Sequence, residues 1–230
     1  MLLKHKETFD GTLGSWKGDQ YDIELRPDVK PYHAKPYPVP HSQEKKLRQE
    51  IERLVTYKVL RKINHSEWAF PSFIMTKKDG ETLRSIADLR ELNKRIKRKP
   101  FPIPKIQEML LKLEGFQWAT CLDLNMGYYH IELTPNASKY CTVVFPWGKY
   151  EYLRLPMGLC NSPDIFQEKM SELMCGLEFA RAYIDELLII SKKDFAEHID
   201  HFDQVLHAWK MLVLKLMQPK VSLERKNWTI

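Results

Sequence analysis

The sequence contains few cysteines: there are four in 230 residues, at Cys121, Cys141, Cys160 and Cys175. No two of them have the short spacing of zinc ligands, and no histidine joins them in such a pattern. Their spacing does not suggest a disulfide framework either. We therefore expect reduced thiols in the core of an intracellular protein.

Long apolar runs are also missing. No stretch approaches the roughly 18 consecutive apolar residues that a membrane-spanning helix needs. The start of the chain, Met1-Leu2-Leu3-Lys4, lacks the apolar centre of a signal peptide. We expect no membrane partner, and a location in the cytoplasm or the nucleus.

The composition favours a folded, basic protein. Hydrophobic residues make up 43% of the sequence, and the formal net charge is +6. A chain of this length can bury a sizeable core, as one large domain or two small ones. The positive charge suits a polyanionic partner but does not demonstrate one.

Two acidic residues interrupt an apolar, strand-forming stretch over 181–190. Residues on both sides favour extended structure, which predicts a β-hairpin with Asp185 and Glu186 at its tip. Such a tip can carry charge into a cleft. The alternative is a surface hairpin whose acidic turn is simply solvated.

A third acidic residue, Asp123, follows a strand-like run over 118–122. This run ends in Asp123, shortly before Gly127. If the two strands are neighbours in one sheet, Asp123 and Asp185 converge. Two carboxylates that close favour a divalent metal, because otherwise their repulsion raises one pKa and costs stability. The pattern is typical of a two-metal site for phosphoryl or nucleotidyl transfer.

Four sequence blocks carry a family resemblance. They are Leu122-Asp123-Leu124-Asn125-Met126-Gly127-Tyr128-Tyr129, Leu155-Pro156-Met157-Gly158-Leu159, Ser162-Pro163 and Tyr183-Ile184-Asp185-Glu186. In order and spacing they resemble the palm motifs of reverse transcriptases (RNA-directed DNA polymerases), especially those in the Pol polyproteins of gypsy-like LTR retrotransposons. The resemblance runs from about Tyr21 to about Lys220, and the joint occurrence of the blocks is highly specific.

The resemblance implies an α+β fold with the fingers and palm of a right-hand polymerase. Its palm would be a four-stranded antiparallel sheet of ferredoxin-like type, backed by helices. The expected parts are a proline-rich N-terminal arm over 1–40, fingers over 41–97 with 131–161, and a palm over 98–130 and 162–230. We expect the thumb to be absent, and RNase H, integrase and protease domains of a polyprotein to lie elsewhere.

Local patterns predict the elements of the first half. The prolines of 1–40 exclude helix and favour an extended arm laid across the domain, with a ligand for a proline-reading module as the alternative. Apolar residues at helical spacing predict a helix over 41–61, capped by Ser42. A hairpin follows, with strands over 68–75 and 82–88.

The later elements are predicted in the same way. We expect a helix over 105–113 and two strands within 142–152 around a Pro-Trp-Gly turn. A helix then begins with Ser162 as its cap and Pro163 in its first turn, and ends near Met174. An amphipathic helix over 194–214 and a strand-turn-strand segment over 214–230 close the chain.

Several residues would bind the incoming nucleotide if the resemblance holds. It implies that Lys77 and Arg84 hold the triphosphate of a dNTP, although a solvated hairpin tip would carry the same charges. The loop with Met157 and Gly158 would close over the nascent base pair, and Gly158 would let the backbone approach closely. Tyr128 would pack under the sugar and leave no room for a 2′-hydroxyl; by itself it is a core aromatic residue.

A run of cations is a candidate contact for the phosphate backbone of an RNA or DNA template with its primer. The run consists of Lys94, Arg95, Lys97, Arg98 and Lys99. A nuclear-localisation patch or a merely solvated run has the same composition. The histidines of the last helix, His198, His201 and His207, are favoured as structural or exposed residues because no third metal ligand is evident.

The family mechanism implies two Mg²⁺ ions, with Mn²⁺ as the alternative, held by Asp123 and Asp185. The backbone carbonyl of Leu124 would complete the shell of the second ion. Glu186 departs from the family, which has a second Asp there, and its longer arm predicts weakened activity.

Two other functions stay open. The first is a catalytically decayed descendant that survives as a nucleic-acid-binding or interaction domain. The second is an RNA-dependent RNA polymerase, which would use ribonucleotides and carry a small residue in place of Tyr128.

Overall fold

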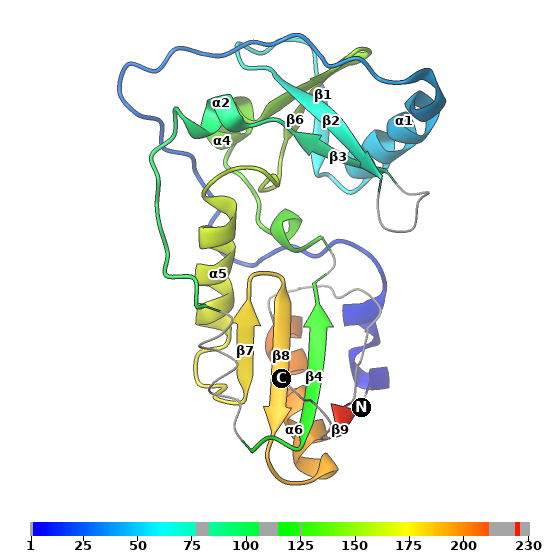
Figure 1. Cartoon of the computed structure of the whole chain (residues 1–230), viewed down its shortest axis with the longest axis vertical. Helices are drawn as coiled ribbons and strands as arrows, with labels where there is room; N and C mark the ends of the chain where they lie inside the picture. Colours follow the sequence, from blue (N-terminus) through cyan, green and yellow to red (C-terminus); the bar gives the residue numbers. More distant parts are fainter. Residues whose placement is uncertain (1, 77–82, 106–114, 125, 212–223, 226–230) are drawn as a thin grey trace. The chain divides into compact units, whose positions relative to one another are not determined.

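The computed structural model describes residues 2–76, 83–105, 115–124, 126–211 and 224–225 (Figure 1). The chain divides into two compact units. Unit 1 combines Met1–Lys17, Lys99–Gly127 and Pro163–Ile230, and unit 2 combines Gly18–Arg98 and Tyr128–Ser162. The first 40 residues are therefore shared between the units.

Unit 1 is built on a four-stranded antiparallel sheet, in the order β7-β8-β4-β9. The strands are β4 (Trp118–Asp123), β7 (Ala180–Tyr183), β8 (Glu186–Ser191) and β9 (Glu224–Arg225). Side chains alternate between the faces: Thr120 and Leu122 are buried, whereas Cys121 and Asp123 are exposed. The predicted α+β fold with a four-stranded palm sheet is thus confirmed.

Two helices support this sheet. Helix α6 (Phe195–Met211) lies behind the strands, and α5 (Ser162–Leu173) runs alongside β7 (Figure 1). Each helix turns a stripe of apolar side chains inward, as the helical spacing of their sequences predicts. The buried members of the stripes are Ile165, Phe166 and Met170 in α5, and Phe202, Val205, Leu206 and Trp209 in α6.

The beginning of α5 differs from the prediction in one detail. The helix starts at Ser162, and the Ser162 hydroxyl donates to the carbonyl oxygen of Pro156 at 2.8 Å. This side chain therefore ties the preceding loop to the helix start. The predicted role of Ser162 as a side-chain cap is wrong.

The N-terminal segment corrects another prediction. Residues Leu2–Phe9 form a 3₁₀ helix, η1, although an extended arm was expected over 1–40. The prolines that exclude helix begin only at Pro27, so nothing prevents helical turns near the start. His5 anchors η1 in unit 1, because its Nε2 lies 3.0 Å from Oδ1 of Asp203 in α6.

From Gly18 to Pro40 the arm contains no helix and belongs to unit 2. Isolated β-bridges join Tyr21 to Leu133 and His33 to Ala69, and Ile23 between them is buried. Near its end the Tyr37 hydroxyl donates to Asp88 at 2.9 Å. Hydrogen bonds, chiefly from Arg90, lower the pKa of Asp88 to about 2.

Unit 2 contains a five-stranded mixed sheet, in the order β1-β6-β5-β2-β3. Its strands are β1 (Leu60–Ile63), β2 (Phe70–Thr76), β3 (Leu83–Ala87), β5 (Thr142–Phe145) and β6 (Gly148–Tyr152). Strands β2 and β5 pair in parallel, and the other pairs are antiparallel. The predicted β2–β3 hairpin and the two strands within 142–152 are confirmed, whereas β1 was not predicted.

The first long helix of unit 2 is shorter than predicted. Helix α1 covers His41–Thr56, and the chain then turns through Lys58, whose φ is +55°, into β1. Leu47, Ile51 and Leu54 are buried, but no side chain caps the helix, because Pro40 occupies the N-cap position. The predicted cap, Ser42, already lies inside the first turn.

Three short helices complete unit 2 and its boundary. They are α2 (Arg90–Asn93), η2 (Gly127–His130) and α4 (Pro135–Tyr140). Thr134 caps α4, and its side chain accepts a hydrogen bond from the Ala137 N–H. No helix in the described ranges is long and apolar enough to cross a membrane.

Some predicted elements lie outside the described residues. The turn at 77–80, nearly all of the helix over 105–113 and most of the segment over 214–230 belong to this group. The helix predicted over 194–214 is confirmed as α6 to Met211.

A buried histidine joins α6 to two strands of unit 1. His198 Nε2 lies 2.8 Å from Thr120 Oγ1 of β4, and Nδ1 lies 2.9 Å from Ser191 Oγ of β8. Burial lowers the pKa of His198, and the nearby His201 lowers it further. The predicted structural role of this histidine is confirmed.

The shift has a defined effect on stability. Because the folded-state pKa of His198 lies below the ordinary value of 6.5, the unfolded chain binds the proton first as pH falls. The stabilisation is complete above pH 6.5 and is lost as pH falls towards the lower folded value.

We expect the free energy of unfolding to fall between about pH 7 and pH 5.5, with this group contributing up to about 1.4 kcal/mol per pH unit. His198→Gln should flatten this slope, because the amide does not titrate. Denaturant unfolding at several pH values measures it, with His207→Gln, at an exposed histidine of α6, as the control. Equal slopes in the wild type and His198→Gln would contradict the assignment.

Candidate active site

The β7–β8 hairpin carries two of the predicted acidic residues, but its turn differs by one residue from the prediction. Tyr183 pairs with Glu186, so the two turn residues are Ile184 and Asp185. Glu186 is the first residue of β8 rather than part of the tip. The prediction erred because it placed both charged residues in the turn, whereas the β-branched Ile184 takes one of the turn positions.

The turn lies against the end of β4. Asp123 is the direct cross-strand neighbour of Glu186, and the Leu124 N–H donates to the carbonyl oxygen of Asp185 at 3.0 Å. Directly opposite residues of an antiparallel pair have Cβ atoms about 4.5–5.5 Å apart. Two predicted acids, Asp123 and Glu186, therefore face each other across the strands, and the backbone of Asp185 is bonded next to them.

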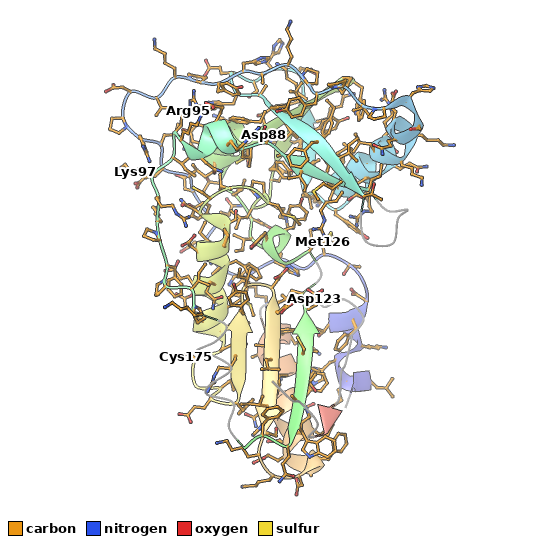
Figure 2. The ribbon with its side chains drawn as sticks, in the orientation of Figure 1. Asp88, Arg95, Lys97, Asp123, Met126 and Cys175 are labelled. Atoms are coloured by element: carbon orange, nitrogen blue, oxygen red, sulfur yellow. The ribbon has the colours of Figure 1, made fainter. Side chains whose placement is uncertain are left out.

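The acids occupy the open end of the sheet. Asp123, Asp185 and Glu186 are all exposed, and Figure 2 shows Asp123 at the end of β4. Partial burial raises the pKa of the neighbouring Cys121 thiol, and the negative charges of Glu186 and Asp123 raise it further. The field at this end of the sheet is thus negative, which favours a cation.

Gly127 leaves space that Asp185 needs. A Cβ atom at this position would meet Asp185 Cβ at 3.2 Å and Phe166 Cζ at 3.3 Å. Both distances are shorter than ordinary van der Waals contact, and Phe166 is fully buried. A side chain at residue 127 would therefore press on Asp185, which explains the glycine in the first sequence block.

The donor set suits a hard divalent cation. Carboxylate oxygens are the ligands that Mg²⁺ prefers. Asp123 and Glu186 supply two carboxylates, and the turn residue Asp185, next to Glu186 in the chain, supplies a third. Within the part of the chain that is described, no group of three or more His, Cys, Asp or Glu side chains is already gathered closely enough to hold a metal. The backbone brings the three acids to one end of the sheet without closing a complete ligand cage.

The predicted nucleotide-binding residues lie in unit 2. Arg84 is exposed on β3, opposite Met75 of β2, and Lys77 falls outside the described residues. Tyr128 is half-buried in η2, and Met157 is half-buried in the loop before α5. Their assignment to a nucleotide stays a prediction.

Gly158 in the same loop has a conformation that explains its residue type. Its φ is +89°, and a Cβ there would lie 3.2 Å from the Ala87 carbonyl oxygen at the end of β3. The Asn93 side chain holds this loop on both sides: its Nδ2 donates to Gly158 O at 2.8 Å, and its Oδ1 accepts from the Cys160 N–H at 2.8 Å. Nothing in the sequence singles out Asn93 beyond its place next to the basic run.

The basic run makes several contacts within unit 2. Lys94 and Arg95 both pair with Glu91, at 2.6 and 2.7 Å. Lys97 pairs with Glu24 at 3.1 Å, and Arg98 donates to the carbonyl of Cys160. Figure 2 shows Arg95 and Lys97 on the segment that follows α2.

These contacts leave much of the charge accessible. The side chains of Lys94 and Lys97 remain 70% and 51% exposed. Lys99, the first residue of its segment in unit 1, is exposed as well. A contact of this run with phosphate stays a prediction.

One buried polar residue near the site was missed by the sequence analysis. Gln167 of α5 bonds the backbone of the β7–β8 hairpin on either side of Tyr183. A glutamine beside the apolar stripe of an amphipathic helix was the available signal.

The match to a protein family agrees with these features. Residues 75–230 match the family described as reverse transcriptase (RNA-dependent DNA polymerase). Among curated relatives, the Pol polyprotein of transposon 412 from Drosophila melanogaster is 31% identical over 210 residues. That alignment covers 88% of this chain and 17% of the relative.

Other relatives give the same result. The Tf2-3 transposon polyprotein of Schizosaccharomyces pombe is 29% identical over 213 residues, covering 92% of this chain and 16% of the relative. This chain thus spans about a sixth of the length of these two polyproteins.

Solved structures show the same fold. The prototype foamy virus protease-reverse transcriptase CSH mutant has a TM-score of 0.88 at 23% identity, covering 98% of this chain and 30% of that one. The foamy viral protease-reverse transcriptase in complex with an RNA/DNA hybrid gives 0.89 at 21% identity, covering 100% and 31%. Because the family match covers more than half of the sequence, this chain belongs to the reverse transcriptase (RNA-dependent DNA polymerase) family.

Proposed function

We propose that this chain is the fingers and palm of an RNA-directed DNA polymerase that adds dNTPs to a primer 3′-hydroxyl. The observation that carries the proposal is the pairing of Asp123 with Glu186 across β4 and β8, with Asp185 in the adjoining turn. The chain is a member of the reverse transcriptase family, and the sequence resemblance assigns these three acids as the catalytic carboxylates, which supports the proposal.

Reverse transcriptases use divalent metal ions, and we infer that Mg²⁺ is the ion here, with Mn²⁺ as a substitute. Asp123 and Asp185 would be its main ligands, with Glu186 and the Leu124 carbonyl as further donors. Bound Mg²⁺ supplies Lewis-acid stabilisation of the charge that develops during nucleotidyl transfer. The protein contributes a negatively charged strand end whose backbone is fixed by the sheet.

The nucleotide would be held by residues of unit 2. Arg84, together with Lys77, has the charge to bind a triphosphate, and the Arg fork matches phosphate oxygens. Gly158 lets the loop backbone approach a ligand, next to Met157. Tyr128 would exclude a 2′-hydroxyl by the bulk of its ring.

A primed RNA or DNA template is the proposed partner. The solved foamy viral enzymes with this fold were captured with double-stranded DNA and with an RNA/DNA hybrid. The cations at 94–99 would contact phosphates without reading sequence, so binding should weaken as salt rises. We infer that RNase H, integrase and protease domains belong to the same polyprotein, which acts in the cytoplasm or the nucleus.

One observation favours a second function. Glu186 has one more methylene than the aspartate of the family, and Mg²⁺ tolerates little distortion of its octahedral shell. A chain that lost activity in this way would survive as a nucleic-acid-binding or interaction domain. Primer extension separates the two, because only the polymerase incorporates dNTPs.

Asp123→Asn should reduce primer extension by on the order of 10²–10³-fold, because it removes a charge that supports the transition state. Asp185→Asn should do the same. Binding of primed template, measured by fluorescence anisotropy, should stay within about twofold. Asp200→Asn, at an exposed aspartate of α6, is the control. Retention of full activity in Asp123→Asn would refute the assignment.

Glu186→Asp should raise the rate of dNTP incorporation by about tenfold, which corresponds to about 1.4 kcal/mol of activation free energy. The shorter arm restores the ligand length of the family without changing the charge. Glu186→Gln keeps the length, removes the charge and should lower the rate. A slower Glu186→Asp enzyme would show that the longer side chain is not the limiting feature.

Tyr128→Val should lower the preference for dNTPs over ribonucleotides by about 10- to 100-fold, because the smaller side chain opens space for a 2′-hydroxyl. The measurement is the ratio of kcat/KM for the two nucleotide types. Tyr128→Phe retains the ring and should keep the preference. An unchanged ratio in Tyr128→Val would exclude Tyr128 as the selecting residue.

A further inference from the structure

The free edge of the palm sheet is held by a side chain rather than by another strand. Strand β7 is the last strand in the order β7-β8-β4-β9, so within the described ranges no strand pairs with its outer edge. On this edge the Ala182 carbonyl and the Ile184 N–H lie two residues apart. An edge strand spaces its outward backbone groups in this way, and both groups need partners when they are covered.

Gln167 of α5 supplies both partners. Its Nε2 donates to the Ala182 carbonyl at 3.1 Å, and its Oε1 accepts from the Ile184 N–H at 2.8 Å. Gln167 is only 2% exposed, and its Nε2 is also 3.2 Å from Ser171 Oγ in the next turn of α5. The amide therefore does for β7 what the backbone of an adjacent strand would do.

The Ile184 contact falls on an unusual backbone conformation. Ile184 has a φ of +52°, in the left-handed region. A β-branched residue adopts this region rarely, and glycine or asparagine is preferred there. Such a conformation persists only where the surroundings over-determine it.

The turn is tied on both sides of this residue. Gln167 holds the N–H of Ile184, and the carbonyl of the following residue, Asp185, accepts from the N–H of Leu124, which follows β4. The peptide group before Ile184 and the peptide group after Asp185 are thus both hydrogen-bonded. A shift in either bond would move its carboxylate relative to Asp123 and Glu186.

We propose that Gln167 is a positioning residue whose buried amide fixes Ile184 in its left-handed conformation and so aims the Asp185 carboxylate. This inference rests on the proposed function, because the orientation of the Asp185 carboxylate matters for catalysis only if Asp185 is a catalytic residue. The need for one donor and one acceptor at the end of a three-carbon arm explains glutamine at this position. Methionine fills nearly the same volume but satisfies neither backbone group.

Gln167→Met tests the proposal in the full chain. We expect kcat for primer extension to fall by about 10- to 100-fold, the usual loss when the support of a functional ligand is removed. KM for the dNTP should change little, because Gln167 touches no predicted nucleotide contact. Gln204→Met is the matched control: this exposed glutamine of α6 bonds only Asp200 of its own helix among the contacts described, and its loss should be silent.

A second substitution separates positioning from packing. Ile184→Gly removes the conformational strain at the turn, since glycine adopts positive φ without cost to a side chain. In the Gln167→Met background it should restore a large part of kcat, because the turn no longer needs an external clamp. If Gln167 acted only by filling the core, the double variant would be at least as impaired as Gln167→Met.

Amide hydrogen exchange gives a readout that does not depend on activity. The Ile184 amide should be protected in the wild type and should exchange at least about tenfold faster in Gln167→Met. The Ile189 amide in the middle of β8 should stay protected, which shows that the sheet is still folded. A wild type without polymerase activity would reject the proposed function, and exchange at Ile184 would still decide whether Gln167 holds the turn.

Two outcomes would overturn the proposal. One is a Gln167→Met variant in which the Ile184 amide keeps its protection while β8 stays folded. The other is a double variant with Ile184→Gly that recovers no activity relative to Gln167→Met in an otherwise active enzyme.

Discussion

The register between β4 and β8 is the constraint on which the rest of this site depends. It places Asp123 opposite Glu186, and it sets Thr120 and Leu122 on the face that packs against α6. A slip of one residue would turn every side chain to the other face. It would bury the Asp123 carboxylate under α6 and expose Leu122. Packing of the hydrophobic core and exposure of the acids therefore require the same strand register.

Polar contacts reinforce this register away from the acidic end. His198 bridges Thr120 and Ser191, one residue from each of the two strands. Because its imidazole is buried and uncharged, it joins the strands without bringing another charge to the sheet. The exposed face of the sheet carries the acidic side chains, whereas the face covered by α6 carries hydrogen bonds between uncharged groups. This division lets three carboxylates gather at one end while the buried side chains of β4 and β8 stay uncharged.

The sequence predicted those strands and helices whose apolar residues repeat at the spacing of one buried face. Apolar alternation that ends in Asp123, and the strand runs around Asp185, predicted strands β4, β7 and β8, whereas the four-stranded sheet was implied by the family resemblance. The helical stripes of α5 and α6 were equally clear. These signals are strong because burial of one face dictates residue type over many positions.

The parts that were missed depend on single contacts or on short segments. Strand β1 has two exposed charged residues among four, so it lacks a recognisable alternation. The exact turn could not be predicted, because Ile184 is a strand former that a hydrogen bond from another element keeps in a turn conformation. Ser42 has the right residue type for a cap, but the helix begins two residues too early for it to act as one.

The division of the chain into units has a consequence for the molecule as a whole. The chain passes between the two units four times, at residues 17–18, 98–99, 127–128 and 162–163. Neither unit is therefore a continuous stretch of sequence. Proteolysis or truncation could not release one unit intact, and gene fusion could not transfer one unit as a single segment. The segments of each unit are separated in sequence by tens of residues that belong to the other unit. Bringing these segments together closes long loops, which raises the entropic cost of folding and couples the folding of the two units. A core connected in this way could be exchanged between proteins only as a whole, not one unit at a time.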